Sequence, residues 1–364
     1  MNFHWFLPTD GDGHYLGTDH LSREGNISYY TQIVQALDRL GFEGVLVPTG
    51  KTCEDPWVVA SALTQMTERL KFLIAIRPSI MSPTVAARMA SAFQRLSNGR
   101  LLLNVVTGGD SKQLAGDGVY LSKEDRYEAT DEYLRVFKDL MKGEKVTFNG
   151  KYVQVTDAEV LYHSSDQPIP LYFGGSSAPA LDIAAKHIDQ YLTWGEPPKM
   201  AKEKIDQVKS LSTDQGRELG YGMRIHIIVR ETDEEAWDAA EKLLTYVSEE
   251  QIASARKAFG EAESEGQRRM AGLTSSKELE VSPNLWAGVG LVRGGAGTAL
   301  VGSPQTVAAR LREYEELGIT SFIMSGYPHL EEAYRVAELL FPILKPDATH
   351  SNRSANLYGK AYSS

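Results

Sequence analysis

The sequence predicts an α/β fold in which eight strand–helix units close into a parallel (β/α)8 TIM barrel. Short apolar runs rich in β-formers alternate with amphipathic helical patterns along most of the 364 residues. Eight such units are counted, the number that closes a barrel. An open doubly wound sheet would show the same alternation. That alternative is disfavoured because no GxGxxG fingerprint follows the first predicted strand.

The first four units follow one another without a break. Their strands are predicted at Asn2–Leu7, Gly44–Val47, Lys71–Ile76 and Arg100–Val106. Their helices are predicted at Ser28–Leu40, Asp55–Thr67, Pro83–Leu96 and Glu124–Lys142. Gly41 follows the first helix as a stop signal, and Pro56 and Pro83 stand near helix starts. The fourth strand is almost wholly apolar, as a strand buried on both faces should be.

The second half begins after a small hairpin predicted at Lys145–Val155, where Phe148-Asn149-Gly150-Lys151 stands between alternating runs. Strands five to eight are predicted at Pro170–Gly174, Gln190–Thr193, Met223–Arg230 and Ser321–Ser325. Helices are predicted at Pro179–His187, Met200–Leu211, Glu234–Val247, Thr306–Leu317 and Leu330–Phe341. A polar helical insertion (249–275) and a glycine-rich run (284–302) separate strands seven and eight. A polar tail, 346–364, follows a single domain predicted over residues 1–345.

Composition excludes several classes of function. The net charge is −10 and the isoelectric point is near 5.4, which argues against a nucleic-acid or anionic-membrane surface. No stretch of about eighteen apolar residues predicts a membrane helix. Cys53 is the single cysteine, so no internal disulfide can form, and this fits a reducing, cytoplasmic location. No His, Cys and carboxylate cluster has metal-binding spacing.

The run 284–302 contains six glycines and one charged residue, Arg293. So many glycines are unfavourable in a regular helix or strand and suit a loop that approaches a ligand closely. A guanidinium group is always charged and grips planar oxyanions with two parallel hydrogen bonds. We therefore expect a mobile flap that carries Arg293 to an anionic substrate.

The residues at the ends of the predicted strands suggest further anion contacts. Gly174-Gly175-Ser176-Ser177 opens a helix, where free N–H groups and the helix dipole favour a phosphate. An ordinary helix cap is the alternative. Arg224 and His226 are two residues apart on one strand and therefore point to the same side. They are equally consistent with a structural ion pair and with an anion site.

Other candidates carry weaker signals. Cys53 is more often a small buried hydrophobe than a nucleophile. Asp10 stands beside glycines and can simply shape a turn. Trp194 and Tyr327 follow strands, and we expect such positions to face the pocket of a barrel.

Several long segments resemble the two-component, reduced-flavin-dependent alkanesulfonate monooxygenases of the bacterial luciferase-like superfamily. The resemblance covers roughly residues 2–342. The matching segments are Phe6-Leu7-Pro8-Thr9, 11–17, Cys53-Glu54-Asp55, Arg77-Pro78, 82–88, 104–108, 172–177, 192–198, 284–302 and 325–335.

This resemblance implies a TIM-like barrel and FMN that arrives reduced from a separate NAD(P)H-dependent reductase. It implies reaction with O2 and cleavage of the C–S bond of an alkanesulfonate to give an aldehyde, sulfite and oxidised FMN. It also implies a homo-oligomer built as a dimer of dimers. A deazaflavin-dependent dehydrogenase and a non-catalytic flavin-binding protein of the same fold remain the alternatives.

The resemblance also assigns roles to residues. It places Arg224, His226, Arg293 and Tyr327 at active-site positions, and Cys53, Trp194 and His329 in the pocket. It assigns Ser176, Ser177 and Tyr127 to the FMN phosphate, and Asn104 and Thr107 to the region near the flavin ring. The family usually has histidine where this chain has Asp10, and a carboxylate there would repel an anionic substrate unless it points away or pairs with an arginine.

Overall fold

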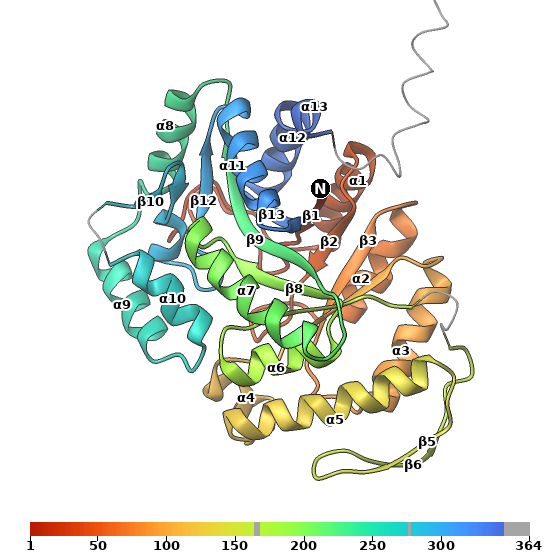
Figure 1. Cartoon of the computed structure of the whole chain (residues 1–364). Coiled ribbons are helices and arrows are strands. Elements are labelled where there is room, and N and C mark those ends of the chain that lie inside the picture. Colours follow the sequence, from red (N-terminus) through yellow and green to blue (C-terminus); the bar gives the residue numbers. More distant parts are fainter. Residues whose placement is uncertain (164–167, 276–277, 346–364) are drawn as a thin grey trace, which may run out of the picture.

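The computed structural model describes residues 1–163, 168–275 and 278–345. Eight parallel strands form a closed barrel in the order β1-β2-β3-β4-β7-β8-β9-β13, and β13 pairs with β1 (Figure 1). The predicted (β/α)8 barrel is therefore confirmed. The strands are β1 (Asn2–Phe6), β2 (Gly44–Val47), β3 (Lys71–Ile76), β4 (Leu101–Val105), β7 (Leu171–Gly174), β8 (Gln190–Trp194), β9 (Gly220–Val229) and β13 (Ile319–Ser325). The predicted tail, 346–364, lies outside the described residues.

Helices surround the barrel. They are α1 (Ile27–Leu40), α2 (Pro56–Leu63), α3 (Pro83–Leu96), α4 (Ser111–Gly116), α5 (Lys123–Met141), α6 (Ala178–His187), α7 (Pro198–Thr213), α8 (Asp233–Leu243), α11 (Pro304–Glu316), α12 (His329–Leu339) and α13 (Phe341–Leu344). Many begin at a side chain that caps the free N–H groups of the first turn, such as Asn26 at α1, Asp55 at α2 and Ser82 at α3. A capping box of Thr232 and Glu235 starts α8. These polar caps are why the helices start close to their predicted positions.

The strands divide their side chains between two apolar layers. On β1, Phe3 and Trp5 belong to the large core between strands and helices. Phe6 faces the other way and packs with Leu46, Leu192 and Ile323 inside the barrel. Arg224 on β9 is in register with Ile323 and Trp194, which places its guanidinium at this interior level. The inward position of Arg224 follows from the two-residue period of the strand.

The chain departs from the simple repeat in three places. A β5–β6 hairpin (Val146–Asn149 and Gln154–Ala158) projects beside α5, which confirms the predicted hairpin (Figure 1). Its turn spans residues 150–153, because Asn149 still pairs with Gln154. The short helix α4 was not predicted, although Asp110 caps it. The insertion forms α9 (Glu249–Gly260) and α10 (Glu265–Leu273), followed by the short strand β10 (Glu280–Ser282).

The expectation that all of 284–302 forms a loop is wrong. The run contains β11 (Leu285–Trp286), a 3-10 turn (Gly288–Leu291) and β12 (Ala299–Gly302). β12 pairs in parallel with the last residues of β9, beyond the point where β8 ends. Its alternating Ala, Leu and Val side chains are buried and outweigh the glycine cost. A loop remains at residues 292–298, and Arg293 lies on it.

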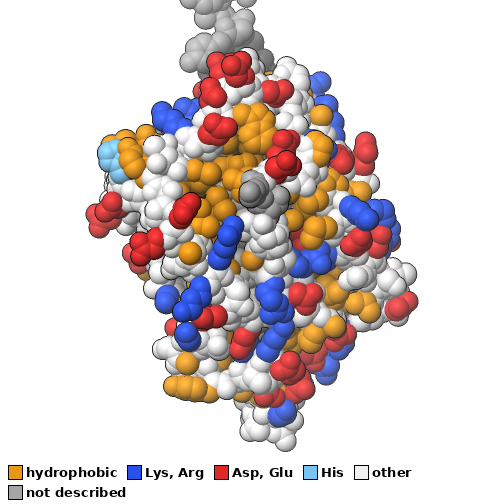
Figure 2. Space-filling view, turned by 90° about the vertical axis from the view of Figure 1, so that its left-hand side faces the viewer, with side chains coloured by type: hydrophobic (Ala, Val, Ile, Leu, Met, Phe, Trp, Pro, Cys, Tyr) orange, Lys and Arg blue, Asp and Glu red, His pale blue; other side chains and the backbone are white. Residues whose placement is uncertain are grey.

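No helix among residues 1–163, 168–275 and 278–345 is long and apolar enough to cross a membrane. Side chains of both charge signs are spread over the face that carries α8 to α10, with hydrophobic side chains gathered in its upper part (Figure 2).

Candidate active site

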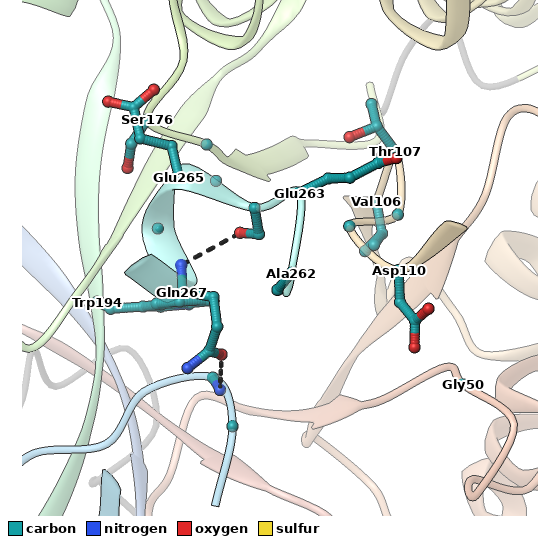
Figure 3. A pocket seen from close by; sticks show the side chains of 18 of the residues that line it. Gly50, Val106, Thr107, Asp110, Ser176, Trp194, Ala262, Glu263, Glu265 and Gln267 are labelled. Atoms are coloured by element: carbon teal, nitrogen blue, oxygen red, sulfur yellow. Dashed lines mark hydrogen bonds between the residues drawn. The ribbon is translucent and has the colours of Figure 1, made fainter. Parts of the chain in front are cut away.

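A cavity of about 890 Å³ opens at the carboxyl ends of the barrel strands. Trp194 lies on one side of it and Val106, Thr107 and Asp110 on the other, with Ala262 of the insertion between them (Figure 3). Nine predicted site residues line it: Cys53, Asn104, Thr107, Tyr127, Ser176, Ser177, Trp194, Arg224 and Arg293. The other four, Asp10, His226, Tyr327 and His329, are not part of the lining. The structure thus brings most of the predicted site residues to one cavity.

Two guanidinium groups share one wall of the cavity. Cζ of Arg224 lies 4.6 Å from the centre of the Phe6 ring, and Cζ of Arg293 lies 5.6 Å from it. An aromatic face attracts cations, so Phe6 offsets part of the repulsion between the two like charges. Within the described part of the chain, neither guanidinium has a carboxylate within 4.0 Å. This wall therefore carries positive charge that is not neutralised by an ion pair.

The electrostatics of the two arginines differ. Burial and then the nearby positive charge of Arg293 lower the pKa of Arg224 to about 9. Burial also opposes the charge of Arg293, but the Tyr327 hydroxyl and the carboxylate of Asp10 outweigh it and raise the pKa of Arg293. Asp10 is exposed and forms no ion pair with Arg293 within 4.0 Å, so it acts on Arg293 through space.

Tyr327 stands behind Arg293. Its hydroxyl accepts a hydrogen bond from Nη1 of Arg293, and its ring stacks on His226 with centroids 5.6 Å apart. Burial raises the pKa of Tyr327 against the opposing effect of the two arginines, so the phenol keeps its proton at neutral pH. We therefore describe Tyr327 as a support for Arg293.

His226 is completely enclosed. Its Nε2 lies 3.0 Å from the carbonyl oxygen of Ala296, and its Nδ1 lies 2.7 Å from Oγ of Ser325. Burial, followed by the charges of Arg224 and Arg293, lowers the pKa of His226 well below its ordinary value. The imidazole is therefore neutral at physiological pH, and both of its nitrogens are engaged by the protein.

His329 and Cys53 have different surroundings. His329 is buried at the start of α12, and its ring contacts Trp5, Phe6 and Tyr327. Its backbone N–H donates to Asp12 across 2.7 Å, and Arg23 holds the same carboxylate. This hydrogen bond fixes the start of α12, so the buried His329 ring packs behind the cavity wall against Phe6 and Tyr327. Cys53 lines the cavity, and burial raises the pKa of its thiol, so the thiol form dominates at neutral pH.

The opposite end of the cavity is suited to a phosphate. Gly174, Gly175, Ser176 and Ser177 line it at the start of α6, whose free N–H groups have no side-chain cap. Ser177 Oγ bonds instead to the hydroxyl of Tyr127 across 3.3 Å. A Cβ at Gly175 would lie 2.5 Å from Cβ of Ala180, so the backbone there passes too close for a side chain. The ordinary-cap alternative is therefore disfavoured by the geometry.

An arginine that was not predicted completes this end. Arg126 precedes Tyr127 on α5, is 3% exposed and lines the cavity. Its Nη2 donates to the carboxylate of Glu263 across 2.7 Å, and Glu263 belongs to the insertion. The lining also contains the apolar side chains of Leu46, Leu192 and Trp194. A phosphate cradle together with apolar lining residues is compatible with a flavin nucleotide such as FMN.

The insertion covers the cavity through specific contacts. Arg269 on α10 pairs with Glu196 at the end of β8, and Lys204 on α7 holds the same carboxylate at 2.6 Å. Gln267 Oε1 accepts from the N–H of Gly295 across 2.8 Å, which joins α10 to the loop that carries Arg293 (Figure 3). A Cβ at Gly266 would lie 3.3 Å from the Trp194 ring, so α10 packs closely on this indole.

Sequence reasoning missed the roles of Phe6, Arg126, Glu196, Arg269 and Ser325. Phe6, Glu196 and Ser325 occupy strand ends, the positions where barrel chemistry is sought, so the signal was present. Arg126 and Arg269 lie inside helices, and their approach to the cavity depends on helix packing. Among the described residues, no group of three or more His, Cys, Asp or Glu side chains is placed to hold a metal ion.

The family model of luciferase-like monooxygenases matches residues 1–321. The chain belongs to this family. As a luciferase-like monooxygenase, it is expected to incorporate oxygen into its substrate. The match covers the cavity lining from Phe6 to Ala296, whereas Ile323 of the lining lies beyond it.

Solved structures of similar fold include flavin and deazaflavin enzymes. A riboflavin lyase with modified FMN and riboflavin gives a TM-score of 0.79 at 19% identity, covering 95% of this chain and 91% of that one. EDTA monooxygenase from Chelativorans sp. BNC1 gives a TM-score of 0.76 at 16% sequence identity, covering 95% of this chain and 93% of that one. An F420-dependent secondary alcohol dehydrogenase gives a TM-score of 0.68 at 18% sequence identity, covering 94% of this chain and 98% of that one. At sequence identities this low, the similarity between this luciferase-like protein and these structures establishes a shared fold alone.

Proposed function

We propose that this protein uses reduced FMN and O2 to cleave the C–S bond of an alkanesulfonate. The observation that carries the proposal is the cavity wall of Arg224 and Arg293, where two guanidinium groups face the cavity without a carboxylate partner within 4.0 Å in the described chain. A sulfonate spreads one negative charge over three oxygens, and guanidinium groups bind such oxygens with paired hydrogen bonds. The adjoining Phe6, Leu46 and Ile323 suit an alkyl chain.

The overall reaction balances with these reactants. One alkanesulfonate (R–CH2–SO3⁻), one O2 and one reduced FMN give an aldehyde, sulfite, oxidised FMN, one water and one proton. The C–S bond breaks and a C=O bond forms at the same carbon. When bound, reduced FMN supplies the two electrons that activate O2.

The residues of this chain divide the remaining work. Ser176, Ser177, Tyr127 and Arg126 would hold the phosphate of FMN, and Asn104 and Thr107 lie beside the place of its ring system. Arg224 and Arg293 bind the sulfonate, and Tyr327 orients Arg293. Trp194 and α10 exclude water from the cavity. Of Arg224 and His226, Arg224 is the favoured proton donor because it lines the cavity, whereas His226 is enclosed and neutral.

Sulfite release tests the proposal. The purified protein is supplied with FMN, an independent flavin reductase, O2 and alkanesulfonates of increasing chain length. We expect sulfite and the matching aldehyde in equal amounts. Arg293→Ala should lower kcat/KM by about 100-fold or more because a charge-stabilising donor is lost. Arg293→Lys keeps the positive charge but loses the paired N–H donors of the guanidinium, so its kcat/KM should lie between those of the wild type and Arg293→Ala.

Near-normal sulfite release by folded Arg293→Ala would refute the role of this arginine. Absence of sulfite with every sulfonate would refute the alkanesulfonate assignment. Hydride transfer with F420 and no O2 uptake would favour a deazaflavin-dependent dehydrogenase. Binding of FMN without turnover of any kind would favour a non-catalytic flavin-binding protein.

The wider setting is also part of the proposal. Reduced FMN would come from a separate NAD(P)H-dependent reductase, and the protein would act in the cytoplasm as a dimer of dimers. Residues 1–345 would form one domain, with 249–302 as its insertion and active-site cover. The single cysteine and the charge of −10 support this setting, since they suit a reducing compartment without a nucleic-acid or membrane partner.

A further inference from the structure

Ser325 at the end of β13 lies between the buried side chains of Arg224 and His226. Its side chain is fully buried, with 0% exposure. Oγ is 2.7 Å from Nη1 of Arg224 and 2.7 Å from Nδ1 of His226. These residues come from two adjacent strands, and Ser325 is directly opposite His226 in the parallel register. The pairing of β9 and β13 therefore fixes this hydroxyl between the two side chains.

The direction of each hydrogen bond follows from the chemistry of the groups. A guanidinium can only donate, so Ser325 Oγ accepts from Arg224. The one hydroxyl proton is then free to go to Nδ1 of His226, which must accept it. The carbonyl of Ala296 can only accept, so Nε2 of His226 carries the ring proton and donates across 3.0 Å. A neutral histidine in a single tautomer satisfies all three bonds.

The chain of bonds joins two parts of the cavity wall. It begins at Arg224 on β9 and ends at the backbone of Ala296, three residues after Arg293 on the loop. The described structure gives Arg224 one other hydrogen bond, to the carbonyl of Ile225 at 3.3 Å. Ser325 thus supplies the shorter contact of the guanidinium and connects it, through His226, to the segment that presents the second arginine.

We propose that Ser325 is a positioning residue that holds the Arg224 guanidinium toward the cavity and keeps His226 in the tautomer that secures the Arg293 loop. It touches neither substrate nor cofactor in this role. The proposal rests on the proposed function for its kinetic test, because Arg224 is there the sulfonate ligand. The relay of hydrogen bonds itself is independent of which substrate binds.

The experiment compares Ser325→Ala, Ser325→Thr and the control Ser321→Ala in the full-length protein. Ser321 is a buried serine on the same strand, with Asn2 and Gly222 as its register neighbours. Thermal unfolding first establishes that each variant is folded. Sulfite release is then measured between pH 7 and 10, and the ring nitrogens of His226 are observed by 15N NMR.

We expect Ser325→Ala to lower kcat/KM by about tenfold or more, since a hydrogen bond to a charged group is lost. The loss of this acceptor also makes the charged form of Arg224 less favourable, so the alkaline limb of kcat/KM should move to lower pH. The Nδ1 resonance should lose the shift caused by an accepted hydrogen bond. Ser325→Thr keeps the hydroxyl, so its alkaline limb of kcat/KM and its Nδ1 resonance of His226 should match those of the wild type.

The proposal would be overturned if Ser325→Ala behaved like the control Ser321→Ala, that is, if the two variants had the same alkaline limb, the same kcat/KM and the same Nδ1 resonance of His226. If the wild-type protein releases no sulfite, the proposed function fails. In that case the Nδ1 resonance alone decides the role of Ser325, because it reports the hydrogen bond without turnover. An Nδ1 resonance unchanged by Ser325→Ala would overturn the proposal there as well.

Discussion

At the scale of single residues, the site is defined by where positive charge is left without a partner. Elsewhere in the described chain, buried carboxylates have cationic neighbours, such as Glu332 with Arg230 and Glu196 with Lys204. Arg224 instead has hydroxyl, carbonyl and aromatic neighbours. A guanidinium buried in this way is costly in the absence of an anion. Binding of the proposed sulfonate would offset this cost and would favour the anionic substrate over neutral analogues.

The lowered pKa of Arg224 gives a pH prediction. The guanidinium is charged below its pKa of about 9 and neutral above it, so sulfonate capture should be present at neutral pH and fall as pH rises through about 9. The measurement is kcat/KM for sulfite release between pH 6 and 10.5. Cys53→Ser serves as the control, because the thiol also titrates at alkaline pH. If the alkaline fall in kcat/KM disappeared in Cys53→Ser, it would be assigned to the thiol, and the prediction for Arg224 would be contradicted.

At the scale of elements, the insertion is held over the cavity by a few polar contacts. α9 contributes no buried residue, and α10 contributes Gln267 and Met270. Apolar burial on these two helices is therefore small. The ion pairs Arg269–Glu196 and Arg126–Glu263 join the insertion to the barrel and its helices, and the bond from Gly295 to Gln267 joins α10 to the loop that carries Arg293. Elements held in this way open at lower free energy than the core does.

Removal of one such contact should loosen the cover. Arg269→Gln leaves Glu196 paired with Lys204 but without its second cation, and we expect the free energy of unfolding to fall by about 1.5–3 kcal/mol. Hydrogen exchange of α10 should speed up, and kcat/KM for sulfite release should fall. The control is Arg268→Gln, since Arg268 is exposed and bonds the backbone of its own segment. Equal exchange rates in both variants would rule out Arg269 as a fastening.

At the scale of the whole molecule, the barrel brings to one opening residues that lie far apart in the sequence. Phe6, Trp194, Arg224 and Arg293 come from three barrel strands and a loop, and they meet because parallel strands all end at the same rim.

The proposed dimer of dimers gives a prediction at this scale. Sedimentation should yield a mass of about four times that of the 40.2 kDa chain, because closed dihedral assemblies are common among soluble enzymes. Measurement over a range of protein concentrations distinguishes a stable assembly from a weak one. A mass equal to a single chain at micromolar concentration would contradict the assembly.

The sequence by itself determined the barrel, the order of its strands and nine of the residues that line the cavity. The barrel and most of these residues depend on local signals: the two-residue period of buried strands, polar caps at helix starts, and the position of chemistry at strand ends. Asn104 and Tyr127 were assigned only by the resemblance to a known family. Tertiary structure decided the rest. Residues 299–302 became a strand because the upper half of β9 offered a free edge, which no local pattern reveals. Ser325 gained its partners because β9 and β13 pair in one register, a contact across 99 residues that depends on closure of the barrel.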